Sequence, residues 1–237
     1  MGTETLAATA RMIVAAGKGV LAADESNGTM SQRLESIGVV PTPDTRRDWR
    51  QLIFTADGLN EYTSGVIMFD ETIRQSSDDG RSLVEILSNA GIVPGIKVDR
   101  GTHPLAGAKG EAVTEGLDGL RGRLAEYFDM GARFTKWRAV MSINDKTPSD
   151  YCIAVNAHAL GRYAALAQEA GLVPIVEPEI LMTGSHSIDD CHAATERTLI
   201  RTFDELSAQG VDLSAMILKP NMVISGHEAP ERATTAE

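Results

Sequence analysis

Cysteine is scarce in this chain, with Cys152 and Cys191 as the only two among 237 residues. Two cysteines exclude a disulfide framework and are typical of a protein from a reducing compartment. Long apolar runs are missing from the start of the chain, where Glu4, Arg11 and Lys18 interrupt an alanine-rich stretch. Such a stretch fits neither a secretion signal nor a membrane span, so we expect a cytoplasmic protein.

Basic residues are outnumbered, because 22 lysines and arginines face 33 aspartates and glutamates, for a net charge of -11. This charge repels phosphate backbones and anionic lipids, so we expect neither a nucleic acid nor a membrane as partner. A local basic cluster can still bind a small phosphorylated substrate. Histidine is rare too, and none of the five shows the spacing of metal ligands: His103, His158, His186, His192 and His227. We therefore expect no metal site.

No proline- or serine-rich linker and no low-complexity run divides the sequence. Hydrophobic residues make up 43% of the chain and charged residues 23%, which is enough apolar surface for a sizeable core. We predict one α/β domain over residues 1–237.

Four glycines about 40 residues apart mark a repeated unit: Gly91, Gly131, Gly171 and Gly210. Each follows an expected helix and precedes an apolar run, as a glycine C-cap does. A strand, a return helix and their loops fit this period of about 40 residues, which predicts a parallel sheet with right-handed crossovers.

Three helix starts can be located from local signals. An alanine-rich helix is expected over 5–15, and a second begins at 42–45, where a threonine precedes a proline. A third is expected to be capped by Thr147, with Pro148 in its first turn. The apolar residues spaced along the second helix are Trp49, Leu52 and Ile53.

Six apolar runs are expected as strands: 20–25, 65–71, 95–99, 134–138, 175–179 and 216–222. The last four carry polar residues two positions apart, so each pair should point to the same face. The pairs are Lys97 and Asp99, Lys136 and Arg138, Glu177 and Glu179, and Lys219 and Asn221. If that face is inward, the pairs meet at the C-terminal mouth of a barrel of alternating strands and helices. An open doubly wound sheet would need a glycine-rich turn after the first strand, where Gly28 stands alone.

Lys219 at the end of the last apolar run is the candidate nucleophile, although a lysine at a strand end is more often part of a salt bridge. Close to another cation such as Lys136, its amine would lose a proton more readily and attack a carbonyl to form a Schiff base. Glu177, expected among apolar residues, would transfer protons, and Asp24 would accept a hydroxyl proton. A protonated imine then acts as an electron sink for carbon–carbon cleavage without a metal.

Five motifs in the same order resemble those of class I fructose-bisphosphate aldolases, from about residue 17 to 226. They are LAADES at 21–26, GIKVDRG at 95–101, FTKWR at 134–138, PIVEPEIL at 174–181 and LKPNMV at 218–223. The resemblance implies a (β/α)8 barrel, with about six of its eight strands in this chain. It also implies reversible, cofactor-free cleavage of fructose 1,6-bisphosphate to dihydroxyacetone phosphate and glyceraldehyde 3-phosphate, a step of glycolysis and gluconeogenesis.

The resemblance also assigns roles to single residues. Lys219 corresponds to the Schiff-base lysine, Glu177 to the proton-transfer residue, Asp24 to the base near the scissile bond and Lys136 to an electrostatic partner. The expected substrate-binding residues are Arg33, Ser26, Lys97, Arg138, Glu179 and Arg46. Thr29 departs from the serine of many relatives but keeps the hydroxyl group.

The family has two further strands, a phosphate loop and a C-terminal tail that this chain does not contain. Residues 234–237 read as a capping box opening a helix, so we expect a C-terminally truncated member, poorly folded and poorly active by itself, with a tetrameric full-length form. Two alternatives stay open. The chain could be another Schiff-base barrel lyase or transaldolase, or a non-catalytic barrel fragment that serves as a binding module.

Overall fold

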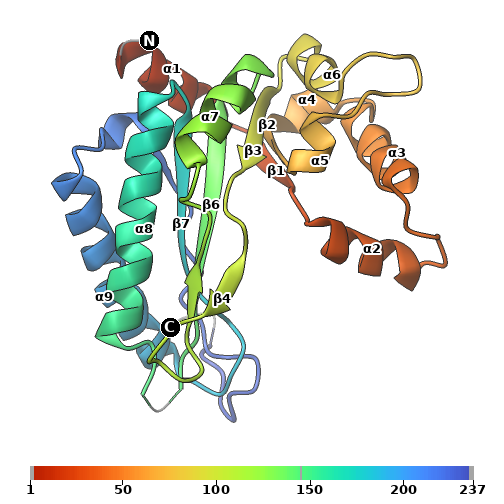
Figure 1. Cartoon of the computed structure of the whole chain (residues 1–237). Helices are drawn as coiled ribbons and strands as arrows, with labels where there is room; N and C mark the ends of the chain where they lie inside the picture. The colour runs from red at the N-terminus through yellow and green to blue at the C-terminus, as the bar shows by residue number, and fades with distance from the viewer. Residues whose placement is uncertain (1–2, 145, 235–237) are drawn as a thin grey trace.

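The computed structural model describes residues 3–144 and 146–234, and its centre is a six-stranded parallel sheet (Figure 1). The strands follow the order β1-β2-β3-β6-β7-β8, and every neighbouring pair is parallel. They are β1 (Gly19–Ala23), β2 (Thr63–Met68), β3 (Val93–Lys97), β6 (Phe134–Met141), β7 (Val173–Ile180) and β8 (Ile217–Leu218). The sheet curls into a half-barrel with β1 and β8 at its edges, which confirms the six expected strands and the barrel class.

Helices connect these strands. They are α1 (Thr3–Ile13), α2 (Asn27–Ser36), α3 (Pro43–Phe54), α4 (Leu59–Tyr62), α5 (Asp70–Ile73), α6 (Leu83–Asn89), α7 (Leu120–Asp129), α8 (Asp150–Glu169), α9 (Ile188–Ala208) and the 3-10 helix η1 (Leu213–Ala215). The two long helices α8 and α9 pack side by side against β6 and β7, whereas α2 and α3 lie beyond the other end of the sheet (Figure 1). No helix in the described ranges is long and apolar enough to cross a membrane.

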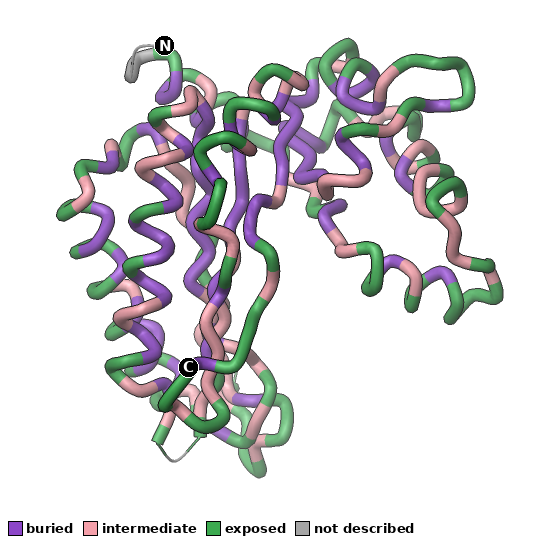
Figure 2. The backbone as a smooth tube through the Cα atoms, in the orientation of Figure 1, coloured by how far each residue is buried: buried purple, intermediate pink, exposed green. Residues whose placement is uncertain are grey.

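The core lies between the sheet and the helices, and Figure 2 shows the central strands as almost continuously buried. Trp137 of β6 stacks on Tyr163 of α8 with a ring-centroid distance of 5.5 Å. The hydroxyl groups of Tyr163 and Thr135 are 2.8 Å apart, so a buried polar pair ties the same helix to the same strand. These contacts make β6 and its helix a firm support for the side chains on the inner face.

The glycine repeat is confirmed as a series of helix ends. All four glycines have positive φ values: 74° for Gly91, 103° for Gly131, 77° for Gly171 and 69° for Gly210. Glycine adopts this left-handed conformation without steric strain because it has no Cβ atom. The four glycines follow α6, α7, α8 and α9, respectively. The repeated sequence unit is therefore one helix and its turn into the next part of the sheet.

Several boundaries differ from the sequence expectation. β6 extends to Met141, so Lys136 and Arg138 lie within this strand and not at its end. β8 has two residues and ends before Lys219. Asp70 and Glu71 do not end β2 but open α5. A hairpin of β4 (Thr102–Pro104) and β5 (Ala112–Thr114), absent from the sequence prediction, inserts between β3 and α7.

Of the two helix caps predicted from the sequence, one was confirmed and one was wrong. Thr42 caps α3 through a hydrogen bond from the backbone N of Thr45, as expected. The prediction for α8 was wrong, because Ser149 accepts the capping bond from Cys152 N at 3.1 Å. Thr147 instead donates its hydroxyl to Ser142 O at 2.7 Å. The capping box expected at 234–237 falls mostly on residues outside the described ranges.

The inward face of α3 also differs from the apolar pattern in the sequence. Leu52 is 65% exposed and Trp49 37%, while Arg50 and Phe54 face the interior at 2% each. The charged side chain of Arg50 therefore takes a core position on α3, where it reaches the end of β1.

Candidate active site

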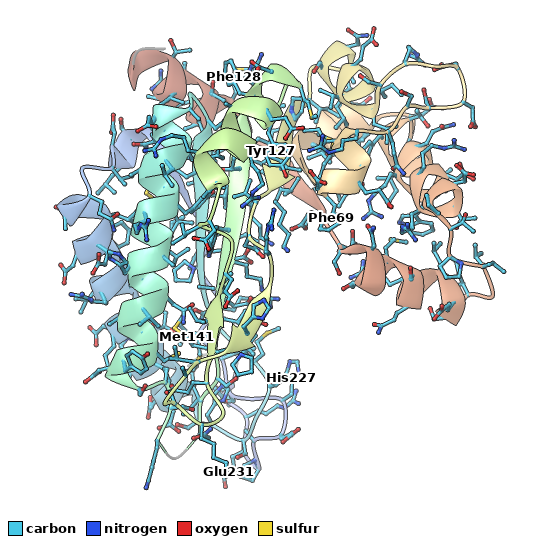
Figure 3. All side chains as sticks on the ribbon, in the orientation of Figure 1. Phe69, Tyr127, Phe128, Met141, His227 and Glu231 are labelled. Carbon is cyan, nitrogen blue, oxygen red and sulfur yellow. The ribbon has the colours of Figure 1, made fainter. Side chains whose placement is uncertain are left out.

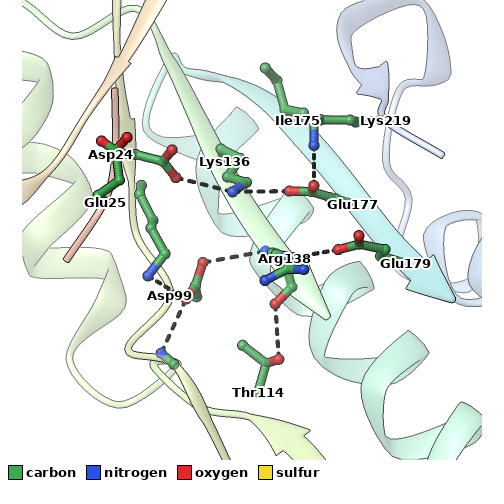
Figure 4. Close-up of polar contacts among 12 residues, drawn as sticks. Asp24, Glu25, Asp99, Thr114, Lys136, Arg138, Ile175, Glu177, Glu179 and Lys219 are labelled. Atoms are coloured by element: carbon green, nitrogen blue, oxygen red, sulfur yellow. Dashed lines mark hydrogen bonds and ion pairs between the residues drawn. The ribbon is translucent and has the colours of Figure 1, made fainter. Parts of the chain in front are cut away.

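Lys136 joins two carboxylates that come from distant parts of the chain. Its Nζ lies 3.0 Å from Asp24 Oδ2, just after β1, and 3.0 Å from Glu177 Oε2 on β7 (Figure 4). The side chains of Lys136, Asp24 and Glu177 are 8, 11 and 4% exposed. The side chains that follow β1 or lie on β6 and β7 thus form a nearly dry ion triad, in which each charge depends on its partners.

Lys136 keeps its proton in this setting. Burial lowers the pKa of Lys136, but the charges of Asp24 and Glu177 outweigh it, so the pKa lies above the ordinary value of 10.5. The surroundings of Glu177 are therefore not purely apolar, contrary to the sequence expectation, because an ammonium group contacts its carboxylate. Lys136 is a fixed cation at neutral pH.

Lys219 completes the row from the edge of the sheet. Its backbone N donates to Val176 O at 2.9 Å, which anchors it next to β7. Its Nζ contacts Glu177 Oε1, so Glu177 stands between two lysines. The Lys219 side chain is 49% exposed, against 8% for Lys136, so it is the amine that a ligand can reach. We call Asp24, Lys136, Glu177 and Lys219 the inner row.

A second row lies one residue pair further along the strands. Lys97 Nζ is 2.8 Å from Asp99 Oδ1, and Asp99 Oδ2 accepts the backbone N–H of Arg138 at 3.3 Å. The Arg138 guanidinium donates to the carboxylate of Glu179. We call Lys97, Asp99, Arg138 and Glu179 the outer row, of which Figure 4 labels the last three. The expectation that Lys136 and Arg138, and Glu177 and Glu179, share a face agrees with these contacts.

Asn221 does not join either row. Its Oδ1 accepts from Ile180 N at 3.3 Å and its Nδ2 donates to Thr195 Oγ1 at 3.0 Å, on the side of α9. The predicted same-face pairing with Lys219 was wrong, because β8 ends at Leu218 and strand alternation does not continue beyond it.

A cavity of about 670 Å³ adjoins the outer row, and Ser26, Lys97 and Asp99 line it. Phe69 and Tyr127 contribute aromatic walls (Figure 3). The Lys97 ammonium lies 5.9 Å from the centre of the Phe69 ring. Ser26 also caps α2, where its Oγ lies 3.1 Å from Thr29 Oγ1, so the hydroxyl kept at position 29 is beside the predicted phosphate contact.

The two remaining predicted binding residues lie apart from the rows. Arg33 on α2 pairs with Glu25 and is 62% exposed. Arg46 on α3 donates twice to the Glu71 carboxylate, at 2.7 Å each, and is 13% exposed. Neither makes a direct polar contact with the inner row among the described residues.

The chain was then compared with known proteins. The profile of the glycolytic class-I fructose-bisphosphate aldolases matches residues 5–237. The chain is 53% identical over its full length to a probable class 1 fructose-bisphosphate aldolase of Xanthomonas campestris, of which it covers 71%. This chain belongs to the class I fructose-bisphosphate aldolase family.

A plant aldolase and an aldolase of known structure are also similar to this chain. A cytoplasmic fructose-bisphosphate aldolase isozyme of Pisum sativum is 52% identical over 231 residues and is covered to 64%. The crystal structure of the Plasmodium falciparum aldolase, solved with TRAP and a small-molecule inhibitor, superposes with a TM-score of 0.96 at 45% identity. The superposition covers 98% of this chain and 68% of that one. The family resemblance in the sequence is thereby confirmed.

Sequence reasoning missed two residues next to Asp24 in the candidate site, Arg50 and Glu25. The Glu25 carboxylate bridges Arg33 and Arg50, with Oε2 2.9 Å from Arg50 Nη2. Burial lowers the pKa of Arg50, and the nearby Glu25 only partly offsets this. One sequence signal was available, namely an arginine four positions before Phe54 on the same helical face.

The described part of the aldolase chain offers no arrangement typical of a metal site. No group of three or more histidine, cysteine or carboxylate side chains is arranged there to hold a metal ion.

Proposed function

We propose that this chain cleaves fructose 1,6-bisphosphate reversibly to dihydroxyacetone phosphate and glyceraldehyde 3-phosphate through a Schiff base on Lys219. The observation that carries the proposal is the inner row, in which an accessible lysine shares one buried carboxylate with a lysine that is fixed as a cation. Because Lys136 is held as a buried cation between two carboxylates, the half-exposed Lys219 is the amine that a substrate ketone can reach.

The first half of the reaction requires proton transfer at Lys219 and Glu177. When Lys219 passes a proton to the Glu177 carboxylate, the neutral amine can attack the substrate ketone and form a carbinolamine. Glu177 then returns a proton to the carbinolamine hydroxyl, which leaves as water while the nitrogen becomes a protonated imine. The contact between Glu177 and Lys219 supports this assignment.

The second half breaks the bond between carbons 3 and 4 of the sugar. Asp24 accepts the proton of the hydroxyl on carbon 4, the new aldehyde leaves, and the electron pair of the broken bond moves into the imine to give an enamine. Lys136 Nζ, 3.0 Å from Asp24 Oδ2, holds this carboxylate in place. Protonation and hydrolysis of the enamine release the second product.

The same row supports a reaction without a metal ion. The Lys136 ammonium already balances Asp24 and Glu177, which are the carboxylates that a catalytic cation would otherwise use. We expect EDTA to leave the cleavage rate unchanged, and a rate that returns only with added divalent metal would contradict the proposal.

The cationic groups around the cavity support a phosphorylated sugar as substrate. Lys97 and Ser26 line it, and Arg33, Arg46, Arg138 and Glu179 are proposed to assist binding from its surroundings. Comparing the cleavage of fructose 1,6-bisphosphate with that of fructose 1-phosphate tests how much the second phosphate contributes.

Trapping with borohydride tests the reaction class. Reduction in the presence of dihydroxyacetone phosphate should add one covalent adduct to the wild-type chain and none to Lys219→Arg, as measured by intact mass. A binding module would show no adduct in either protein. A different Schiff-base lyase would form an adduct with another carbonyl compound and leave the bisphosphate uncleaved.

We also infer that the 237-residue chain alone cleaves the substrate more slowly than its longer relatives. The described sheet is open at its edge strands, β1 and β8. Lys219 comes directly after β8, which pairs with β7 through only two residue pairs, so few contacts hold it in place. A rate equal to that of the Xanthomonas relative would contradict this. A cytoplasmic location and a tetrameric full-length form are proposed from the family, and fractionation and native mass spectrometry test them.

A further inference from the structure

Arg50 is a buried cation whose side chain, 3% exposed, reaches from α3 to the end of β1. Its Nε donates to Ala23 O at 2.9 Å, and its Nη2 donates to Glu25 O at 3.3 Å. These two carbonyls belong to the residues on either side of Asp24. Nη2 also contacts Glu25 Oε2 at 2.9 Å, and Nη1 lies 2.8 Å from Met30 Sδ.

The end of β1 needs such support because the sheet supplies little there. β1 is an edge strand, and its pairing with β2 ends at Ala23 opposite Met68. Asp24 is therefore the first residue beyond the ladder. Buried carbonyl groups require donors, and the planar guanidinium can serve two of them in one fixed geometry.

Arg50 contacts the backbone that carries Asp24, while the described contacts of the Asp24 carboxylate go to Lys136. An arginine that fixes both neighbouring carbonyls restricts the rotation of the intervening residue. Asp24 is thus held by its backbone on one side and by its carboxylate on the other. Arg50 therefore orients the backbone at Asp24, whereas Lys136 balances the charge of its carboxylate.

We infer that Arg50 is a positioning residue that fixes the direction of the Asp24 carboxylate toward the hydroxyl proton it accepts. This role rests on the proposed function, in which Asp24 acts during bond cleavage and not during Schiff-base formation. A misplacement of about 1 Å at such a group can lower a rate by about a hundredfold. Loss of the two hydrogen bonds from Arg50 to these carbonyls should consequently slow cleavage, while the imine still forms on Lys219.

The test is a set of variants in the full chain: Arg50→Lys, Asp24→Asn and the double variant. Lysine keeps the positive charge but cannot span both carbonyls. We expect Arg50→Lys to lower kcat for fructose 1,6-bisphosphate about 10- to 100-fold, with KM and the rate of borohydride trapping within about twofold of wild type. The double variant should be no slower than Asp24→Asn alone, because both changes remove the same function.

Arg47→Lys provides the matched control. Arg47 is the same residue type on the same helix, but it pairs with Asp48 and Asp78 at the surface, and its replacement should leave kcat unchanged. Circular dichroism checks the fold of each variant, and Arg50→Gln, which keeps one amide donor, is examined if Arg50→Lys does not fold.

Each outcome decides between the roles. If the losses of the single variants multiply in the double variant, or if trapping slows in parallel with kcat, Arg50 does not act through Asp24. If neither replacement at position 50 folds and forms the adduct, Arg50 serves the fold and the inference is wrong. If the wild-type chain itself forms no adduct on Lys219, the proposed function fails and the role of Arg50 fails with it.

Discussion

The two ion pairs between β6 and β7, Lys136–Glu177 in the inner row and Arg138–Glu179 in the outer row, join the same charges but differ in burial. In the inner row, Lys136 on β6 and Glu177 on β7 are 8 and 4% exposed. In the outer row, Arg138 is 42% exposed and Glu179 20%. The difference indicates that the Lys136–Glu177 pair is held away from water, and we expect the more exposed Arg138–Glu179 pair to be the one that can exchange its carboxylate partner for a substrate phosphate.

The glutamates two residues apart on β7 should separate the rows most clearly. Glu177→Gln removes the group that transfers protons at Lys219, and we expect kcat to fall by about 10²- to 10⁴-fold. Glu179→Gln is the matched control from the outer row and should change kcat less than about tenfold. Steady-state kinetics of bisphosphate cleavage measure both, and equal losses would show that the two rows do not differ in function.

The lysine and arginine of β6 test the same contrast in stability. Lys136→Met leaves Asp24 and Glu177 without their shared cation, which should lower the free energy of unfolding by about 3–5 kcal/mol. Arg138→Met breaks a half-exposed pair and should cost less than about 1 kcal/mol. Urea unfolding followed by tryptophan fluorescence compares the two variants. A similar loss for both would contradict the assignment of a dry inner row.

The pH dependence of unfolding sharpens this prediction. Because the pKa of Lys136 is raised above 10.5 in the folded chain, its stabilisation is complete below that pH and declines as the pH rises through the folded value. The difference in unfolding free energy between wild type and Lys136→Met should therefore be constant from about pH 7 to 9.5 and shrink above about pH 10.5. A difference that already shrinks between pH 7 and 9 would mean that Lys136 is not held as a cation.

Asp99 should give the smallest of these effects, and it acts on specificity. Asp99→Asn removes the charge beside Lys97 while it keeps a side chain that can accept from Arg138 N. With Lys97 less well placed, kcat/KM should fall about tenfold for fructose 1,6-bisphosphate and little for fructose 1-phosphate. Asp129→Asn, at the exposed end of α7, serves as control. An equal fall for both sugars would assign Asp99 to the fold.

The strand-borne residues of the site were predictable because a simple geometric rule governs them. Lys136 and Arg138 lie inside a long strand, as do Glu177 and Glu179, so alternation places each pair on one face. The rule fails for Asn221, because β8 ends at Leu218 and regular strand alternation does not extend to residues 219–221.

Other features depend on contacts that no local pattern contains. Thr147 and Ser149 are both capping residue types, but Ser149 caps α8 and also donates its backbone N–H and its hydroxyl to the Glu111 carboxylate, a tertiary contact that no local pattern contains. Arg50 takes the inward position on α3 because the carbonyls after β1 need a donor there. In the sequence, only its place four residues before Phe54 indicates that this arginine faces inward, and its partners on β1 are visible only in the fold.

The identity of the lysine that carries the adduct tests the central claim most directly. After borohydride reduction with dihydroxyacetone phosphate at neutral pH, peptide mapping by mass spectrometry should find the adduct on Lys219 and leave Lys136 unmodified. This result follows if Lys136 is the fixed cation and Lys219 the reactive amine. An adduct on Lys136, or one spread over surface lysines, would contradict the account.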